Sequence, residues 1–589
     1  MLLNGLLFLP LYLFNRDTSS FLPVFDAASR SVGSLARQLL LWRNNLDIFR
    51  LNLEVTLLAA LWVHLRWLWQ GRRSRLYRAL FIAGYFLALG YAIYESVFLS
   101  LYQIDPVFYA QARMAVDGVG FVVDPLQWPW TLYAAGVALA AVLALLVVHL
   151  SRTLIGGAPP ERLSRATRWA LIALALWAVL PAFAMSLPLA SPKSAVNSLA
   201  VKLEQNLAES LALRGRIAAF DSQTPQRVYD YGGYRLLQKP DIYLIFVESY
   251  GSVLYKRRDW QPAYEKLLAG LEQELASGGW HAATALSESP TWGGGSWMAY
   301  TSALVGLRID NHAQYLSLLD EYQSATYPDL GRYLQSQGYY SAFVTSIARE
   351  LRESDRLQYL NFYGVNDWVD FSRLGYIGPR YGWGPAPPDQ YVLWQVETEL
   401  AETLDQPLFL FYLTQNSHYP WVPQPELAED WRALNQPSQD PSAPLPDQIP
   451  QAAKRRNYLN AVEYQLRFLT DWIVKADHEN AVYVLIGDHQ PQQVSRRDDG
   501  FDTPIHIISR DAGLIQSFGD YGFVGGLIVD EVEPVMRHEG FYSLLVRTLL
   551  ARYGQGDKVL PAYLPNGIVL DSLDVRDQST LRRQDHDTD

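Results

Sequence analysis

The stretch "YLIFVESYGSVLY" at residues 243–255 decides how the second half of this chain folds. A run of Tyr, Leu, Ile, Phe and Val is typical of a strand that is buried on both faces of a sheet. The run ends at Glu248, and small polar residues follow at once. In open α/β sheets, the loops at the carboxyl ends of strands hold the functional groups. Glu248 is therefore either an acid that caps a strand beside a solvated loop or a residue of an active site.

From residue 241 onward, short apolar segments alternate with amphipathic ones. Strands are predicted at 241–248, 280–286, 339–345, 407–413, 481–486 and 503–508, and helices at 259–277, 328–337, 389–404 and 455–476. Strands that alternate with helices predict a mostly parallel sheet covered by helices. The loops after the strands are expected to carry the chemistry.

Length and composition exclude several classes of protein. The chain has 589 residues, which is more than one ordinary domain contains. Its net charge of −11 argues against a nucleic-acid partner, because nucleic-acid binding usually needs a basic face. The sequence has no Cys, so disulfides and thiolate metal sites are excluded.

The long apolar segments are concentrated in the first 190 residues. Four of them are long enough to cross a bilayer, which takes ~20 residues, and they lie near 51–70, 78–101, 129–150 and 168–187. The shorter segment 1–14, "MLLNGLLFLPLYLF", fits a span, a signal-peptide core or an interfacial anchor. It lacks a basic leader and a small-residue cleavage motif, so we favour a retained first helix. Residues 1–190 are thus expected to form a helical transmembrane domain of about five spans.

Charges in the loops predict the orientation of these spans. The segments 71–78 and 151–168 are rich in Arg and are expected in the cytoplasm, whereas 102–128 carries only Arg113. This arrangement places the chain after residue 190 outside the cytoplasm. Residues 191–240 are expected to form an amphipathic juxtamembrane helix and a linker. The segment 571–589 is expected to be a disordered tail.

Two acids, Glu54 and Glu95, fall inside the apolar segments, where a carboxylate is costly. They could line an entry site for a lipid headgroup. We favour the alternative that they lie near the span ends and extend to the interface.

Three of the predicted strand ends carry residues that bind metals. Glu248 follows the first strand, "VYVLIGDHQPQ" places Asp488 and His489 after another, and "FLFYLTQNSHYPW" places His418 after a third. Carboxylate oxygen and imidazole nitrogen together suit one divalent metal ion.

A glycine-rich loop lies in "PTWGGGSWMAYTSALVGLR" at 290–308. Three glycines precede Ser296, and a segment compatible with a helix follows. Such a loop lets backbone N–H groups approach a phosphate, and a metal could activate the hydroxyl as a nucleophile. The alternative is an ordinary serine N-cap after a turn.

The segments "DIYLIFVES", "GGGSWMAYTSALVGLR", "NSHYPW" and "VLIGDHQP" resemble successive motifs of the alkaline phosphatase superfamily. They are similar to the sulfatase-like branch that contains lipoteichoic acid synthases, phosphoglycerol transferases and lipid A phosphoethanolamine transferases. The resemblance covers roughly 240–550 and implies an α/β alkaline-phosphatase-like catalytic domain over 241–570. It also implies a five-span bacterial inner-membrane protein with this domain periplasmic or extracellular.

The resemblance also implies roles for individual residues. Ser296 corresponds to the nucleophile, because Gly306 stands ten residues after it as in the family, and Thr291 is its rival. Together with Ser296, the metal ligands would be Glu248, Asp488 and His489. The cofactor would be one divalent ion, Zn²⁺ or Mn²⁺.

Three further residues are candidates for binding the substrate. His418 resembles the histidine that contacts the phosphoryl group or protonates the leaving group. Arg356 resembles an arginine that holds the phosphate or headgroup, although Arg349 and Arg352 are close by. His506, in "TPIHIIS", could contact the substrate or a second metal, although a histidine within a strand is more often a core residue.

The function implied by the resemblance is metal-dependent transfer of a phospholipid headgroup, as phosphoglycerol or phosphoethanolamine. The group would pass through a phosphoryl-serine intermediate to a hydroxyl of a glycan or lipid at the bilayer. A membrane-anchored phosphodiesterase or phosphatase is the alternative, and a non-catalytic membrane scaffold is a further one. The chain has no Cys and lacks the "CxPxR" context, which argues against sulfate-ester hydrolysis.

Overall fold

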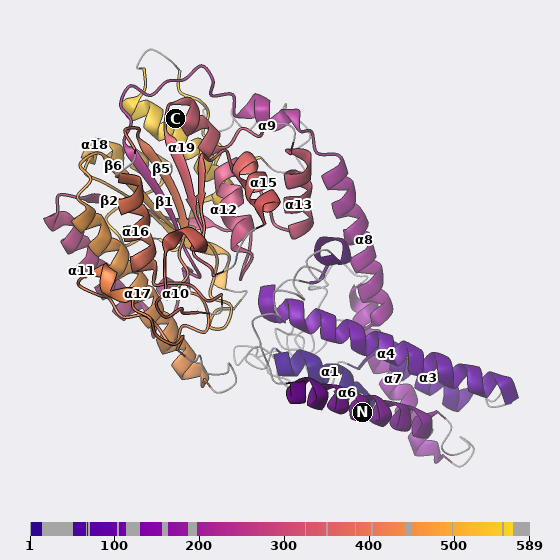
Figure 1. Ribbon diagram of the computed structural model, residues 1–589. Coiled ribbons are helices and arrows are strands. Elements are labelled where there is room, and N and C mark those ends of the chain that lie inside the picture. The colour runs from indigo at the N-terminus through magenta and orange to yellow at the C-terminus, as the bar shows by residue number, and fades with distance from the viewer. Residues whose placement is uncertain are drawn as a thin grey trace. The chain divides into compact units, whose positions relative to one another are not determined.

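The computed structural model describes most of the second half of the chain and the helical parts of the first half. The described residues are 2–14, 51–65, 68, 71–102, 105–112, 130–155, 163–185, 197–323, 326–348, 352–382, 384–401, 404–441, 449–496, 499–529, 531–555 and 559–568. The tail predicted at 571–589 lies outside them. The chain divides into two compact units, Met1–Arg214 and Gly215–Asp589 (Figure 1).

The first unit is helical. Its elements are α1 (Leu2–Phe14), α3 (Leu53–His64), α4 (Gly71–Tyr102), α6 (Trp130–Leu154), α7 (Arg165–Met185) and most of α8 (Leu199–Ala218), which continues into the second unit. The first helix packs against α4, where the Tyr85 hydroxyl donates to the Leu3 carbonyl at 2.7 Å. Leu7, Trp62 and Phe81 are buried in the same apolar cluster.

Two of the described helices are long and apolar enough to cross a membrane, over Gly71–Ser100 and Tyr133–Leu154. The segment expected to span at 51–70 contains α3, which has only 12 residues. At ~1.5 Å per residue this helix covers roughly 18 Å, whereas the hydrocarbon core of a bilayer is about 30 Å thick. The expected count of about five spans is therefore not confirmed.

The two acids in the apolar segments have protein partners. Glu54 accepts hydrogen bonds from the hydroxyl of Ser198 and from the N–H groups of Leu199 and Ala200, so it caps the start of α8. Glu95 of α4 is buried, and its carboxylate pairs with Lys202 of α8 at 2.5 Å. Both acids therefore bind the start of α8, and their position at a membrane interface stays a prediction.

The second unit is built on a mixed sheet that has nine strands in the described part of the chain. The strand order is β4-β3-β5-β1-β6-β7-β2-β8, with β9 beside β2. The strands are β1 (Asp241–Val247), β2 (His281–Glu288), β3 (Tyr340–Val344), β4 (Asp367–Val369), β5 (Leu408–Leu413), β6 (Ala481–Gly487), β7 (Asp502–Ser509), β8 (Val524–Gly525) and β9 (Pro534–Arg537). Neighbours from β4 to β6 are parallel, whereas β7 runs against both β6 and β2.

Helices cover both faces of the sheet (Figure 1). In β1, Leu244 and Phe246 face one apolar core, and Ile245 and Val247 face the other. This double burial explains why the strand is a continuous apolar run in the sequence.

The helices divide between the two cores. Those of the first core include α12 (Ser296–Val305), α14 (Leu330–Ser336) and α19 (Phe541–Tyr553). Those of the second core include α11 (Gln261–Ser277), α16 (Asp389–Ala401) and α17 (Gln451–Ala476). Shorter helices are α9 (Gln223–Val228), α10 (Val253–Lys256), α13 (His312–Glu321), α15 (Glu353–Tyr363) and α18 (Ala512–Ser517).

Candidate active site

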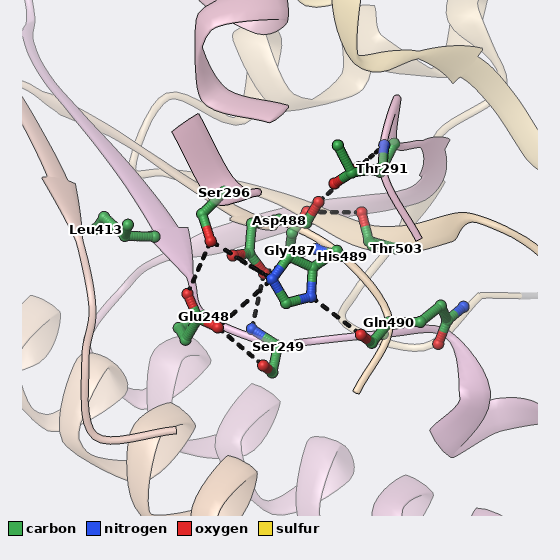
Figure 2. A network of polar contacts seen from close by, with 12 residues as sticks. Glu248, Ser249, Thr291, Ser296, Leu413, Gly487, Asp488, His489, Gln490 and Thr503 are labelled. Carbon is green, nitrogen blue, oxygen red and sulfur yellow. Dashed lines mark hydrogen bonds and ion pairs between the residues drawn. The ribbon is translucent and has the colours of Figure 1, made fainter. Parts of the chain in front are cut away.

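The central strands bring three of the predicted ligands to one edge of the sheet. Val247 of β1 pairs with Gly487 of the parallel strand β6, so Glu248 and Asp488 leave the sheet side by side. Glu248, Asp488 and His489 are all buried, and each offers a ligand atom within 4.8 Å of the others (Figure 2).

At this edge of the sheet, the backbone after β1 lies very close to the end of β6. A Cβ atom on Gly487 would lie 1.9 Å from the Tyr250 carbonyl oxygen, so only glycine fits at the end of β6. Ser249 has φ of 56°, in the left-handed region that residues other than glycine seldom adopt. In this conformation its N–H donates to Asp488 Oδ1 at 2.7 Å.

The remaining ligand atoms converge on one another. In the described part of the chain, Asp488 Oδ2 has no hydrogen-bond donor. His489 Nδ1 lies 3.0 Å from the Gln490 carbonyl, which can only accept, so Nδ1 carries the proton. The unprotonated Nε2 lies 3.3 Å from Asp488 Oδ2 and 3.5 Å from Glu248 Oε1. A cation would satisfy all three groups, and this donor set fits a divalent metal.

The electrostatics of these groups favour a bound cation. Burial raises the pKa of Asp488 well above its usual range, and the neighbouring Glu248 carboxylate adds to the rise. Burial lowers the pKa of His489, and the nearby His418 acts in the same direction. The imidazole of His489 is therefore neutral, which is the form that binds metals.

Ser296 is the first residue of α12 and is only half-buried. It follows Gly295, whose φ of 75° lets the chain turn sharply into the helix. Ser296 Oγ lies 3.1 Å from Glu248 Oε2 and 3.4 Å from His489 Nε2. The hydroxyl thus faces the ligand cluster at a helix amino end, where N–H groups favour a bound phosphate.

The rival hydroxyl, Thr291, lies in a different environment. Its side chain is buried, and Oγ1 makes no hydrogen bond within the described part of the chain. Its N–H donates to the Ser289 hydroxyl at 3.2 Å, and Ser289 in turn donates to the Asp488 carbonyl at 2.6 Å. Figure 2 shows Ser296, not Thr291, turned toward Glu248 and His489.

His418 lies in the loop that follows β5. Its Nδ1 donates to the Tyr419 carbonyl at 2.7 Å, since a carbonyl only accepts. The same loop is tied to the first metal-ligand candidate, because Ser417 Oγ donates to the Glu248 carbonyl at 2.7 Å. The structure therefore brings this loop to the edge of the ligand cluster.

Two predicted substrate contacts have other partners in the structure. Arg356 lies on α15, where it pairs with Glu353 at 2.8 Å. His506 is buried in β7, with the hydroxyls of Tyr250 and Thr284 at 2.8 and 2.7 Å from its two ring nitrogens. Burial lowers the pKa of His506 to about 3. His506 is thus buried in the core, and both of its ring nitrogens have hydrogen-bond partners.

Two residues near the cluster were missed by sequence reasoning. Ser249 orients the Asp488 carboxylate, because its N–H donates to Asp488 Oδ1. Asp389, at the start of α16, accepts hydrogen bonds from the loop that carries His418. A helix was predicted to begin at 389, so an Asp at that position indicated a cap and gave no sign of a contact with a distant loop.

The comparison with protein families finds one match. Residues 297–507 match the sulfatase family model. The match begins directly after Ser296 and includes His418, Asp488 and His489. A comparison with curated proteins finds no match.

Among solved structures, the lipoteichoic acid synthase LtaP from Listeria monocytogenes is 16% identical, with a TM-score of 0.34, over 48% of this chain and 71% of that one. The phosphoglycerol transferase GacH of Streptococcus pyogenes, solved with sn-glycerol-1-phosphate, is 15% identical over 56% of this chain and 80% of its own, with a TM-score of 0.34. The soluble domain of lipooligosaccharide phosphoethanolamine transferase A from Neisseria meningitidis is 14% identical over 54% of this chain and 89% of that one, with a TM-score of 0.35. These likenesses are too distant to assign a substrate. The family match shows that residues 297–507 of the second unit are similar to the sulfatase family.

Proposed function

We propose that this protein transfers a phospholipid headgroup, as phosphoglycerol or phosphoethanolamine, to a hydroxyl of a glycan or another lipid. One observation carries the proposal: the Ser296 hydroxyl, at the amino end of α12, faces the buried ligand cluster of Glu248, Asp488 and His489. A nucleophile beside such a cluster suits phosphoryl transfer through a covalent intermediate. The similarity of residues 297–507 to the sulfatase family supports the same class of reaction.

The metal would be one divalent ion, Zn²⁺ or Mn²⁺, held by Glu248, Asp488, His489 and Ser296. Oxygen-rich ligation with one imidazole suits either ion. When bound, such an ion lowers the pKa of a hydroxyl that it contacts and neutralises charge on a phosphate.

The side chains of the site account for the proton transfers. Ser296 Oγ forms a bond to phosphorus while the bond from phosphorus to the diacylglycerol oxygen breaks. The hydroxyl proton moves to the Glu248 carboxylate that Ser296 faces at 3.1 Å. Protonated His418 gives its proton to the departing diacylglycerol oxygen.

The second half of the reaction reverses these roles. The acceptor hydroxyl gives its proton to His418 while its oxygen replaces Ser296 on phosphorus. Ser296 then recovers its proton from Glu248. The N–H groups at the start of α12 favour the negative charge on the phosphoryl oxygens throughout.

The helical unit supports a lipid as the donor. Two of its described helices are long and apolar enough to cross a membrane. Anchoring in the bacterial inner membrane would hold the catalytic domain, on the outer side, close to phospholipid headgroups.

Intact mass spectrometry tests the proposal directly. The metal-loaded protein is incubated with vesicles of phosphatidylglycerol and phosphatidylethanolamine, and the adduct is located by peptide mapping. We expect a phosphoglycerol or phosphoethanolamine adduct on Ser296, absent from Ser296→Ala and present in Thr291→Ala. Release of free headgroup phosphate whether or not an acceptor is added would identify a hydrolase. The absence of both an adduct and lipid consumption would overturn the proposal.

A further inference from the structure

The loop at 414–418, which carries His418, is held by a carboxylate on another element. Asp389, the first residue of α16, is fully buried. Its two oxygens accept the N–H of Gln415, each at 3.0 Å, and Oδ2 accepts the N–H of Asn416 at 2.9 Å. The hydroxyl of Tyr412, near the end of β5, also donates to Asp389 Oδ1.

The loop binds the helix in return. Asn416 Oδ1 accepts the N–H of Asp389 at 2.6 Å, and Asn416 Nδ2 donates to the Pro387 carbonyl at 3.2 Å. The loop side chain therefore satisfies a backbone N–H at the start of α16 that has no partner within the helix.

Asp389 differs from the aspartates that cap other helices in this unit. The side chain of Asp329 accepts from the N–H of Arg332 in its own helix, α14, and Asp511 does the same in α18. These are ordinary N-caps, which stabilise the helix that they precede. Asp389 instead directs its carboxylate at the backbone of the loop, so helix capping does not explain it.

The other side of the loop is fixed to β1. Thr414 donates its N–H to the Phe246 carbonyl at 2.9 Å, and its hydroxyl accepts the Glu248 N–H at 3.1 Å. Ser417 Oγ donates to the Glu248 carbonyl at 2.7 Å. The loop thus lies between a buried carboxylate and the backbone of a candidate metal ligand.

We infer that Asp389 is a positioning residue for the proposed transfer: it fixes loop 414–418 and thereby sets where His418 meets the phosphoryl group. The inference rests on the proposed function for its catalytic consequence. The loop contacts themselves do not depend on the substrate.

The test compares Asp389→Asn with Asp329→Asn in the full-length protein. Both replace a buried helix-start carboxylate by an amide of the same size, but Asp329 does not contact loop 414–418. Asp389→Asn keeps only one acceptor oxygen and removes the negative charge, so the hydrogen bonds that hold the loop are fewer and weaker. We expect kcat to fall about 10- to 100-fold, the range for losing one or two charge-assisted hydrogen bonds, with KM and metal content close to wild type.

A second readout separates positioning from general destabilisation. Hydrogen exchange of the peptide containing 414–418 should speed up about tenfold or more in Asp389→Asn, while peptides of α14 exchange as in wild type. Asn416→Ala, which removes the loop's side of the contact and keeps the carboxylate, should show the same pattern more weakly.

Two results would overturn the inference. One is wild-type kcat and wild-type exchange of 414–418 in Asp389→Asn and Asn416→Ala. The other is an equal loss of kcat and metal in Asp329→Asn. If the wild-type protein transfers no headgroup, the proposed function fails, and hydrogen exchange still decides whether Asp389 holds the loop.

Discussion

Ser296 Oγ lies 3.1 Å from Glu248 Oε2, although the two residues are 48 positions apart in the chain. The contact joins the first residue of α12 to the residue that follows β1. A nucleophile is most effective when its oxygen is held close to the groups that activate it, because orientation lowers the entropic barrier. We therefore expect this contact and its neighbours to form an active site.

Removing the Ser296 hydroxyl should abolish turnover and leave the metal in place. Ser296→Ala deletes the attacking oxygen but keeps Glu248, Asp488 and His489, so we expect at least ~10³-fold lower kcat. Metal content, measured by plasma mass spectrometry after gel filtration, should stay near wild type. Thr291→Ala is the matched control and should retain activity. Normal turnover by Ser296→Ala would rule out this nucleophile.

Removing the Asp488 carboxylate should release the metal. Asp488→Ala deletes a buried ligand oxygen beside His489, which lies 3.3 Å away. We expect the purified variant to contain little Zn²⁺ or Mn²⁺ and to show no turnover. Ser296→Ala, measured in parallel, controls for loss of activity alone. Wild-type metal content in Asp488→Ala would place the metal elsewhere.

His418→Ala should slow turnover and spare the metal. His418 lies on the loop beside Glu248 and is not among the three residues whose ligand atoms converge. Loss of a general acid–base typically lowers rates by roughly 10²–10⁴-fold, and we expect kcat to fall in this range. A metal-free variant would instead make His418 a ligand.

The strands could be predicted from the sequence where a run of apolar residues is long enough and is buried on both faces of the sheet. The predicted strand at 241–248 matches β1, because Leu244 and Ile245 are buried on opposite faces and leave no polar interruption. The short strands β4 and β8 have three and two residues, too few for any periodicity to show. They form because longer neighbours offer unpaired backbone groups, which the local sequence does not reveal.

The convergence of the three candidate ligands could be predicted from the sequence, whereas the other residues around them could not. Glu248, Asp488 and His489 follow two strands that lie side by side, and strand ends of a parallel sheet meet at one edge. Which other polar side chains reach that edge depends on long-range packing. His506 was taken as a substrate contact, but Tyr250 and Thr284, from distant segments, occupy both of its nitrogens.

The ion pair between Glu95 and Lys202 should hold α8 to the helical unit. Both side chains are largely buried, at 4% and 12% exposure, and removing one partner leaves the other charge uncompensated. Glu95→Gln should therefore lower the stability of this unit by about 3–5 kcal/mol. The double variant Glu95→Gln with Lys202→Met should recover much of the loss, measured by thermal unfolding in detergent. Equal stability of wild type and Glu95→Gln would show that the pair contributes nothing.

The pair of His478 and Glu397 should make stability depend on pH. Their Nε2 and Oε1 atoms lie 2.5 Å apart, and Glu397 also accepts from Trp472 Nε1 at 2.6 Å. The hydrogen bond to Glu397 raises the pKa of His478 above its ordinary 6.5, against the effect of burial. The folded state therefore holds this proton more tightly than the unfolded state does. The resulting stabilisation is complete below pH 6.5 and is lost as the pH rises through the raised folded pKa.

The matched variant is His478→Gln, which keeps a donor for Glu397 but cannot titrate. Wild type should be more stable than this variant by about 1 kcal/mol below pH 6.5, a typical size for one partly buried hydrogen bond to a charge. The difference should shrink toward zero by about pH 9, well above the ordinary histidine range. Thermal unfolding of wild type and His478→Gln over this pH range measures the difference in stability. Glu397→Gln is a second control. A difference that grows with pH would mean that His478 is neutral in the folded protein at every pH tested.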